Sequence, residues 1–284
     1  MLQIHSFEFL KDNLAYPEGA HWARLQNGFA FVEWEGDRVW MTVDGEAQVL
    51  FELGSGEGPS GLCQDMTGNF WLCLYSAGKL VWYDPQGMEM AAYNTCAGQR
   101  FKGPNDLVMD VRGGIYFTDS GDFEHDWQSG DPAGALYYRS VDGELACVDS
   151  GLCYPNGVAL SPGGGTLYLA EHRQNRILAY DVAEAGKLSN QRVFYELDVD
   201  CLLPEEEAFS LGPDGMCVDS QGNLWVAHYG GGKLVVLSPD GKLNSMFYLP
   251  NGRKPTNVAL SPDNHWVYIT EVEYGRVIKI GIGE

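Results

Sequence analysis

The sequence predicts an all-β fold, a six-bladed β-propeller closed by its N-terminal strand. Two observations carry this prediction: a sequence unit that recurs along the whole chain, and the lack of any helical pattern of useful length. Units 59–87 and 213–240 match almost position for position, beginning PSGLCQDMTGNFWLCL and PDGMCVDSQGNLWVAH. In each unit, short apolar segments alternate with turns rich in Gly, Asn, Asp and Pro, which indicates strands joined by hairpins.

A proline starts each of the six units. These prolines are Pro17, Pro59, Pro104, Pro155, Pro213 and Pro255, at intervals of 42, 45, 51, 58 and 42 residues. A period of this length with four short strands in each unit is typical of a β-propeller. Six units therefore predict six blades in one domain that spans residues 1–284.

The last unit has room for only three strands before Glu284, whereas residues 4–10 (IHSFEFL) form an isolated strand pattern ahead of the first unit. We expect this N-terminal strand to supply the fourth strand of the last blade. Closing the ring in this way removes the open sheet edges.

Charge and cysteine content limit the partners and the compartment. The net charge is −21, from 18 basic and 39 acidic residues, and such a surface repels phosphate backbones and anionic lipid. We therefore expect no nucleic acid and no membrane partner, but a small neutral substrate, and a monomer or small homo-oligomer. The seven cysteines are an odd number without a CxxC pair. They indicate reduced core residues, among them Cys63, Cys73 and Cys217, in a cytoplasmic protein.

The residue after each starting proline lies on the innermost strand, so the six together form a ring around the channel. They are Glu18, Ser60, Asn105, Asn156, Asp214 and Thr256. Turn formation is an ordinary reason for Asn, Asp or Ser after proline, but it does not explain Glu18. Two carboxylates and two carboxamides facing one another would be costly to bury without a cation between them. Such oxygen ligands indicate one divalent metal ion, Ca²⁺ first, with Mg²⁺, Mn²⁺ or Zn²⁺ as alternatives.

Several motifs make the chain similar to a known family. They are PEG at 17–19, GPND at 103–106, GGIYFTDS at 113–120, YPNG at 154–157 and PDGM at 213–216. With them the chain resembles the family of senescence marker protein (regucalcin), gluconolactonase and luciferin-regenerating enzyme, which are six-bladed propellers with one divalent metal ion in the channel. The resemblance implies that Glu18, Asn156 and Asp214 hold the metal ion and that Asn105 contacts metal or substrate. It also implies that Asp214 is the general base or proton shuttle.

A second set of polar residues ends the second strand of each unit. The aligned positions are Glu33, Leu74, Asp119, Glu171, His228 and Glu271. Residues of this kind commonly bond to turn backbone and stiffen the rim; the alternative is contact with substrate hydroxyls, for which we name Glu33, Asp119 and His228. Some related lactonases carry an arginine at the position of Gly103, and Lys102 beside it is a further candidate for substrate binding.

Two insertions enlarge the repeat on the same face. They are 120–134 and 198–212, and long loops in compact domains are usually functional or disordered. We expect them to form a rim or lid over the site. His125 and Trp127 either touch substrate or decorate the loop surface.

The leading hypothesis is a metal-dependent hydrolase that opens a sugar lactone, as gluconolactonase does, or a similar cyclic ester. The metal ion would polarise the carbonyl group, and Asp214 would move the proton. One alternative is an aryl-ester or organophosphate hydrolase on the same metal site. Others are a non-catalytic calcium-binding propeller and, with less support, a strictosidine synthase-like relative. The sequence has no GxSxG, P-loop or HExxH motif, and fold alone does not separate these hypotheses.

Overall fold

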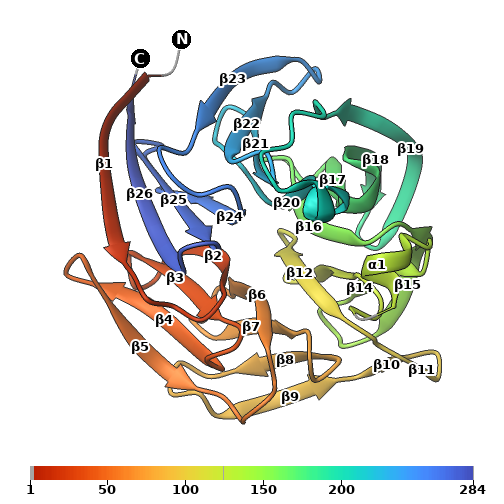
Figure 1. Ribbon diagram of the computed structural model, residues 1–284. Coiled ribbons are helices and arrows are strands. Elements are labelled where there is room, and N and C mark those ends of the chain that lie inside the picture. The colour runs from red at the N-terminus through yellow and green to blue at the C-terminus, as the bar shows by residue number, and fades with distance from the viewer. Residues whose placement is uncertain (1–2, 124, 284) are drawn as a thin grey trace.

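The computed structural model describes residues 3–123 and 125–283 of the chain. In this part of the chain, six four-stranded antiparallel sheets surround a central axis (Figure 1). A short hairpin of β10 (Thr95–Cys96) and β11 (Gln99–Arg100) connects the second sheet to the third. The prediction of a six-bladed propeller is confirmed.

The blades follow one another in chain order. Blade 1 contains β2 (Pro17–Ala23), β3 (Gly28–Glu33), β4 (Arg38–Val43) and β5 (Glu46–Glu52). Blade 2 contains β6 (Pro59–Gln64), β7 (Phe70–Leu74), β8 (Lys79–Tyr83) and β9 (Glu89–Tyr93). Blade 3 contains β12 (Pro104–Met109), β13 (Ile115–Asp119), β14 (Gly134–Arg139) and β15 (Leu145–Leu152). Blade 4 contains β16 (Pro155–Leu160), β17 (Thr166–Glu171), β18 (Arg176–Glu184) and β19 (Lys187–Glu196). Blade 5 contains β20 (Gly212–Val218), β21 (Leu224–Tyr229), β22 (Lys233–Leu237) and β23 (Leu243–Tyr248).

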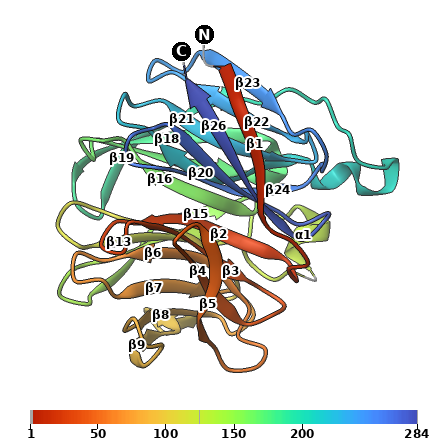
Figure 2. The ribbon, with the colours of Figure 1, turned by 90° about the vertical axis from the view of Figure 1, so that its left-hand side faces the viewer.

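Blade 6 is assembled from both ends of the chain. It contains β24 (Pro255–Leu260), β25 (Trp266–Glu271) and β26 (Arg276–Gly283), and its outermost strand is β1 (Gln3–Lys11). β1 pairs antiparallel with β26 from Gln3 opposite Gly283 to Lys11 opposite Val277. Figure 2 shows the two strands side by side. The expected closure by the N-terminal strand is therefore confirmed.

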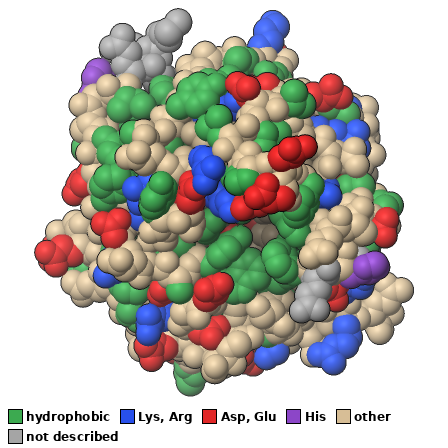
Figure 3. All heavy atoms as spheres, viewed as in Figure 1, with side chains coloured by type: hydrophobic (Ala, Val, Ile, Leu, Met, Phe, Trp, Pro, Cys, Tyr) green, Lys and Arg blue, Asp and Glu red, His purple; other side chains and the backbone are tan. Residues whose placement is uncertain are grey.

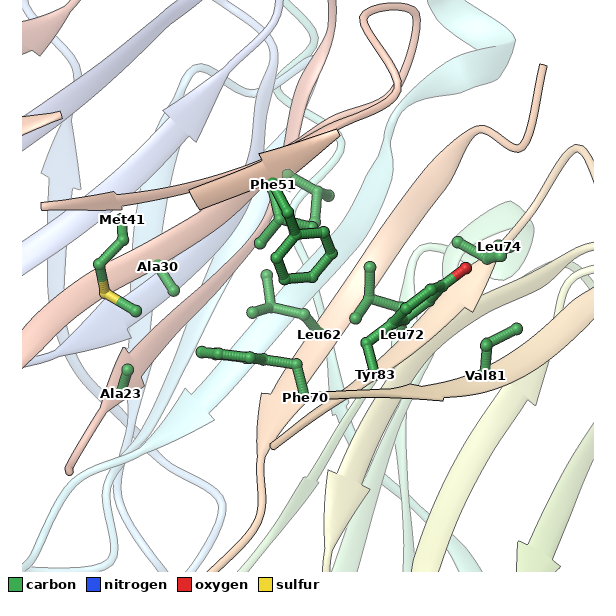
Figure 4. Close-up of a cluster of buried hydrophobic side chains, with 12 residues drawn as sticks. Ala23, Ala30, Met41, Phe51, Leu62, Phe70, Leu72, Leu74, Val81 and Tyr83 are labelled. Carbon is green, nitrogen blue, oxygen red and sulfur yellow. The ribbon is translucent and has the colours of Figure 1, made fainter. Parts of the chain in front are cut away.

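The hydrophobic core lies between neighbouring blades. Phe51 of blade 1 packs with Leu62 and Phe70 of blade 2 in one buried cluster (Figure 4). Alternate residues of a strand point to opposite faces of the sheet. Val32 of β3 therefore joins this cluster, whereas its neighbour Phe31 joins a cluster shared with blade 6. Because each blade buries both faces, the inner strands are held rigidly, and they carry the site.

The cysteines are unpaired among the residues that the structure describes. Cys63 and Cys73 are buried, but Cys217 is only half-buried, so the prediction for Cys217 was wrong. Its strand contributes to the wall of an open cavity at the far end of the channel. No helix in the described ranges is long and apolar enough to cross a membrane.

Candidate active site

Each innermost strand contains a break in its pairing register near the starting proline. The breaks lie at Glu18/His21, Pro59/Gly61, Pro104/Leu107, Pro155/Val158, Pro213/Met216 and Pro255/Asn257. Such β-bulges leave backbone unpaired and turn a side chain away from its regular direction. The repeated Pro-x-Gly, Pro-x-Asp and Pro-x-Asn motifs thus place the residue after each proline at an irregular point beside the axis.

Four of the six ring residues converge on one cavity. Glu18 of β2, Asn105 of β12, Asn156 of β16 and Asp214 of β20 all line a pocket of about 140 Å³ on the propeller axis. Each of these side chains is at most 8% exposed. The structure therefore brings together the four residues that the sequence singled out as metal ligands.

The other two ring residues brace the neighbouring blades instead. The Ser60 hydroxyl donates to the backbone carbonyls of Pro104 and Asn105, at 3.0 and 2.7 Å. The Thr256 hydroxyl donates to the carbonyl of Pro17 at 2.8 Å. A hydroxyl is short enough to reach these carbonyls, so Ser60 and Thr256 stabilise the backbone beside the ligand residues without lining the pocket.

The two ring carboxylates share a site that favours a cation. Burial first, and then repulsion by Asp214 and Asp106, raises the pKa of Glu18 well above its usual value. Burial and repulsion by Asp106 likewise raise the pKa of Asp214, although the Asn156 amide donates a hydrogen bond to it. Among the described residues that line the pocket, none is Lys or Arg. An external cation is therefore the group that can compensate both charges.

The donor set fits a hard divalent ion. All four side chains offer oxygen, two as carboxylates and two as carboxamides. The described residues hold no cluster of three or more His, Cys, Asp or Glu side chains arranged for a metal, so a nitrogen- or sulfur-rich site of the zinc type is not formed here. Oxygen-only sets of this kind suit Ca²⁺ or Mg²⁺. The residues present fit the predicted metal ion.

A third carboxylate, Asp106, lies deeper in the channel and was not singled out from the sequence. It is 7% exposed, and it accepts hydrogen bonds from the backbone N–H groups of Leu107 and Val158 at 2.9 and 3.1 Å. Burial raises its pKa to about 7. Asp106 lines a second cavity, of about 1080 Å³, at the other end of the inner strands.

The pocket walls come from the rim and from both insertions. The first insertion, which contains α1 (Asp126–Ser129), contributes Phe123 and Trp127; the second, which contains the 3₁₀ helix η2 (Glu205–Ser210), contributes Glu207, Phe209 and Ser210. The Arg173 guanidinium lies 5.7 Å from the Trp127 ring centre and 5.1 Å from that of Phe209. Cation–π contacts of this kind are attractive, so Arg173 ties the two insertions together.

His172 is a pocket residue that the sequence analysis missed. It begins the 3₁₀ helix η1 (His172–Gln174), directly after the strand end at Glu171. It is 1% exposed, and its Nε2 lies 2.8 Å from the carbonyl of Ser210. Burial lowers its pKa to about 4, so the ring is neutral at pH 7. The alignment of strand ends stopped one residue short of it.

The residues at the aligned strand ends do not line the pocket. Asp119 accepts hydrogen bonds from the backbone N–H groups of Lys102, Gly103 and Gly121, at 2.9, 2.8 and 3.1 Å. Because the turns of the rim offer unpaired N–H groups at this height, a carboxylate there is taken up by backbone. Lys102 is exposed outside the pocket. The bracing interpretation therefore describes Asp119 better than substrate contact does.

The same correction applies to Glu33 and His228. Glu33 accepts hydrogen bonds from the Ala15 N–H at 2.7 Å and from the Trp40 indole at 3.0 Å. His228 is fully buried, and its Nε2 lies 3.0 Å from the Asn175 side-chain oxygen. Neither side chain reaches the pocket. His125, on the first insertion, is exposed and lies outside the pocket lining as well.

The amino-acid sequence itself identifies the family of this propeller with four buried oxygen donors on its axis. Residues 93–273 match the SMP-30/gluconolactonase/LRE-like region, and the chain belongs to this family.

Relatives and solved structures agree with this assignment. The chain is 27% identical over 237 residues to a diisopropyl-fluorophosphatase of Loligo vulgaris, covering 80% of this chain and 72% of the relative. It is 25% identical over 287 residues to a gluconolactonase of Zymomonas mobilis, covering 93% and 78%. A solved gluconolactonase of Xanthomonas campestris superposes with a TM-score of 0.81 at 25% identity, covering 98% of this chain and 89% of that one.

Proposed function

We propose that this protein is a metal-dependent hydrolase that opens small neutral lactones, sugar lactones or similar cyclic esters. The observation that carries the proposal is the convergence of Glu18, Asn105, Asn156 and Asp214 at the floor of one buried pocket. Relatives named gluconolactonase and diisopropyl-fluorophosphatase support a hydrolase of lactones or esters. Fold alone would not, because propellers host many unrelated activities.

The four floor residues would hold the divalent ion, with Ca²⁺ the first expectation. When bound, such an ion supplies a Lewis acid toward an ester carbonyl. Asp214 is one of only two carboxylates among the four floor residues, and it is the one to which the family resemblance assigns proton transfer. In our proposal Asp214 takes the proton of the attacking water, and that proton later reaches the leaving alkoxide.

Size and charge limit the substrate. A cavity of about 140 Å³ suits one small ring rather than a drug-sized ligand. The one carboxylate among the described lining residues above the floor, that of Glu207, pairs with Lys254, with 2.6 Å between its oxygen and the ammonium nitrogen. With the protein's net charge of −21, this arrangement disfavours anionic substrates. Unpaired cysteines are in keeping with a cytoplasmic enzyme.

Hydrolysis of a fluorophosphate or an aryl ester is the second candidate, favoured by the similarity to the diisopropyl-fluorophosphatase. A buried oxygen-ligated ion could serve a phosphoryl oxygen as well as a carbonyl oxygen. A calcium-binding propeller without catalysis is the third; in that case a divalent ion would bind and stabilise the protein, but no ester would turn over.

One experiment separates the three. The purified protein is loaded with Ca²⁺, Mg²⁺, Mn²⁺ or Zn²⁺ in turn and assayed with a pH indicator against lactones, aryl esters and a fluorophosphate. We expect acid release from lactones that excess chelator abolishes and added metal restores, together with a higher melting temperature in the metal-bound form. Full activity in chelator would contradict metal dependence, and stabilisation without any turnover would favour the calcium-binding alternative.

A further inference from the structure

The wall of the pocket above the floor is aromatic. Half of the described lining residues are Phe, Trp or Tyr. At the mouth, Phe123 and Phe209 keep 45% of their surface exposed. Figure 3 shows a group of hydrophobic side chains beside the centre of this face, below it in the view, with acidic and basic side chains bordering the centre from above.

Most polar groups on this wall have partners within the protein, whereas Nδ1 of His172 is buried without a hydrogen-bond partner among the described residues. The Tyr154 hydroxyl lies 3.0 Å from that of Tyr75. Tyr16 and Tyr229 are hydrogen-bonded to each other through their side chains. Nε2 of His172 is engaged by the Ser210 carbonyl at 2.8 Å. What the wall offers to a ligand is therefore mainly the faces of rings.

The wall also lacks a group for recognising an anion. The Glu207 carboxylate is paired with Lys254, and Lys254 itself is not part of the pocket. In the described lining, no guanidinium or ammonium group faces the ligand. A ligand that carries several hydroxyls would have to leave most of them unpaired in this pocket, and buried polar groups without partners are strongly disfavoured.

We infer that the site selects lactones whose ring bears alkyl or aryl substituents over polyhydroxylated sugar lactones. This inference rests on the proposed function and narrows its substrate class. The ester group would lie at the floor, beside Asp214 and Asn156. The apolar substituent would lie against Trp127 and Phe209, at the mouth.

The test compares lactones that share one ring size. δ-Valerolactone, δ-octalactone and D-glucono-δ-lactone are assayed with metal-loaded protein after subtraction of spontaneous hydrolysis. We expect kcat/KM to rise about threefold to fourfold for each methylene that the pocket buries, and δ-octalactone to exceed gluconolactone by at least tenfold. A higher kcat/KM for gluconolactone than for δ-octalactone would overturn the inference while leaving the proposed function standing.

A binding measurement keeps the two claims separate. The corresponding δ-lactams hydrolyse far more slowly than lactones, and their binding can be followed by the fluorescence of Trp34 and Trp127, which line the pocket. Tighter binding of the propyl-substituted lactam than of the polyhydroxy lactam supports the inference even if no lactone turns over, an outcome that overturns only the proposed function. Equal or reversed affinities contradict the inference.

Phe209→Ser supplies the matching variant. Because this ring is half-exposed on a 3₁₀ helix, its loss should leave the fold intact. We expect the preference for δ-octalactone over δ-valerolactone to fall by about fivefold to tenfold through KM, as expected when the burial of between one and two methylenes is lost. Leu243→Ser on β23, an equally exposed apolar residue far from the pocket, is the control and should leave the ratio unchanged. If Phe209→Ser leaves the preference for δ-octalactone over δ-valerolactone unchanged, the apolar substituent does not bind against this wall.

Discussion

The Ser60 hydroxyl donates a hydrogen bond of 2.7 Å to the backbone carbonyl of Asn105, one blade away. The two residues occupy equivalent places in their blades, each directly after the starting proline. Asn105 faces the pocket, and Ser60 holds the backbone of Asn105 in place. The ring around the axis is thus made of ligand candidates and of hydroxyl braces between them.

Ser60→Ala tests the brace. The substitution leaves the carbonyl groups of Pro104 and Asn105 buried without their hydroxyl donor, so we expect a loss of about 1–2 kcal/mol in the free energy of unfolding and weaker Ca²⁺ binding. Chemical denaturation and calorimetric titration measure the two effects. The matched control is Ser245→Ala, because the Ser245 hydroxyl has no hydrogen-bond partner among the described residues. Equal stability of the two variants would show that the Ser60 bonds contribute nothing.

Asp214→Asn and Glu18→Gln separate metal binding from proton transfer. Each keeps an oxygen donor and removes one charge, so both should weaken metal binding. Only Asp214→Asn also removes the proposed proton carrier, and its kcat at saturating metal should fall by about 10²-fold or more. Turnover of a lactone is measured for both variants across a metal titration. If Asp214→Asn recovers as fully as Glu18→Gln, Asp214 is a ligand only.

Asp119→Ala should affect stability rather than chemistry. The substitution removes the acceptor of three backbone N–H groups, those of Lys102, Gly103 and Gly121. We expect the free energy of unfolding to fall by about 3 kcal/mol, with KM and kcat of the remaining folded protein changed less than threefold. Asp142→Ala, on an exposed turn, is the control. A large rise in KM without loss of stability would restore the substrate-binding interpretation of Asp119.

Asp106 should make the metal-free protein less stable as the pH rises. Burial raises its folded-state pKa to about 7, whereas the unfolded value is about 3.9. Its contribution is therefore fully present below about pH 4 and is lost as the pH rises through about 7, at up to about 1.4 kcal/mol per pH unit. We expect the stability of the wild type relative to Asp106→Asn, both in excess chelator, to fall over this range. A difference in the free energy of unfolding between the two proteins that does not change with pH would show that the pKa of Asp106 is not raised in the folded protein.

The sequence predicted the blades and the floor of the site because both follow from the repeat. Each blade must bury two faces and reverse direction at fixed points, so apolar alternation and turn residues recur in register. The position after the proline recurs with them, which is why Glu18, Asn105, Asn156 and Asp214 could be found together. The same rule did not reveal that Ser60 and Thr256 bond to backbone, because a short hydroxyl serves either purpose.

The walls of the site could not be predicted in this way. Trp127 and Phe209 lie on insertions without a period, and their meeting over Arg173 depends on the three-dimensional course of both loops. The prediction that carboxylates at the strand ends contact substrate was wrong for a different reason. A rim position suits a ligand contact and a turn-bracing bond equally well, and only the N–H groups around Asp119 and Glu33 decide between them.

Closure of the ring by β1 also sets an order on folding during synthesis. β1 leaves the ribosome before the other strands described here, whereas its pairing partner β26 is made after all of them. Until β26 has been made, β1 therefore lacks its pairing partner, and the nascent chain presents an open strand edge to its surroundings. Long-range pairing of this kind is slow to form, and unpaired edges invite pairing with other chains. Glu8 and Lys11 place charges on β1. Charged side chains on an unpaired strand disfavour pairing with other chains until the last blade assembles.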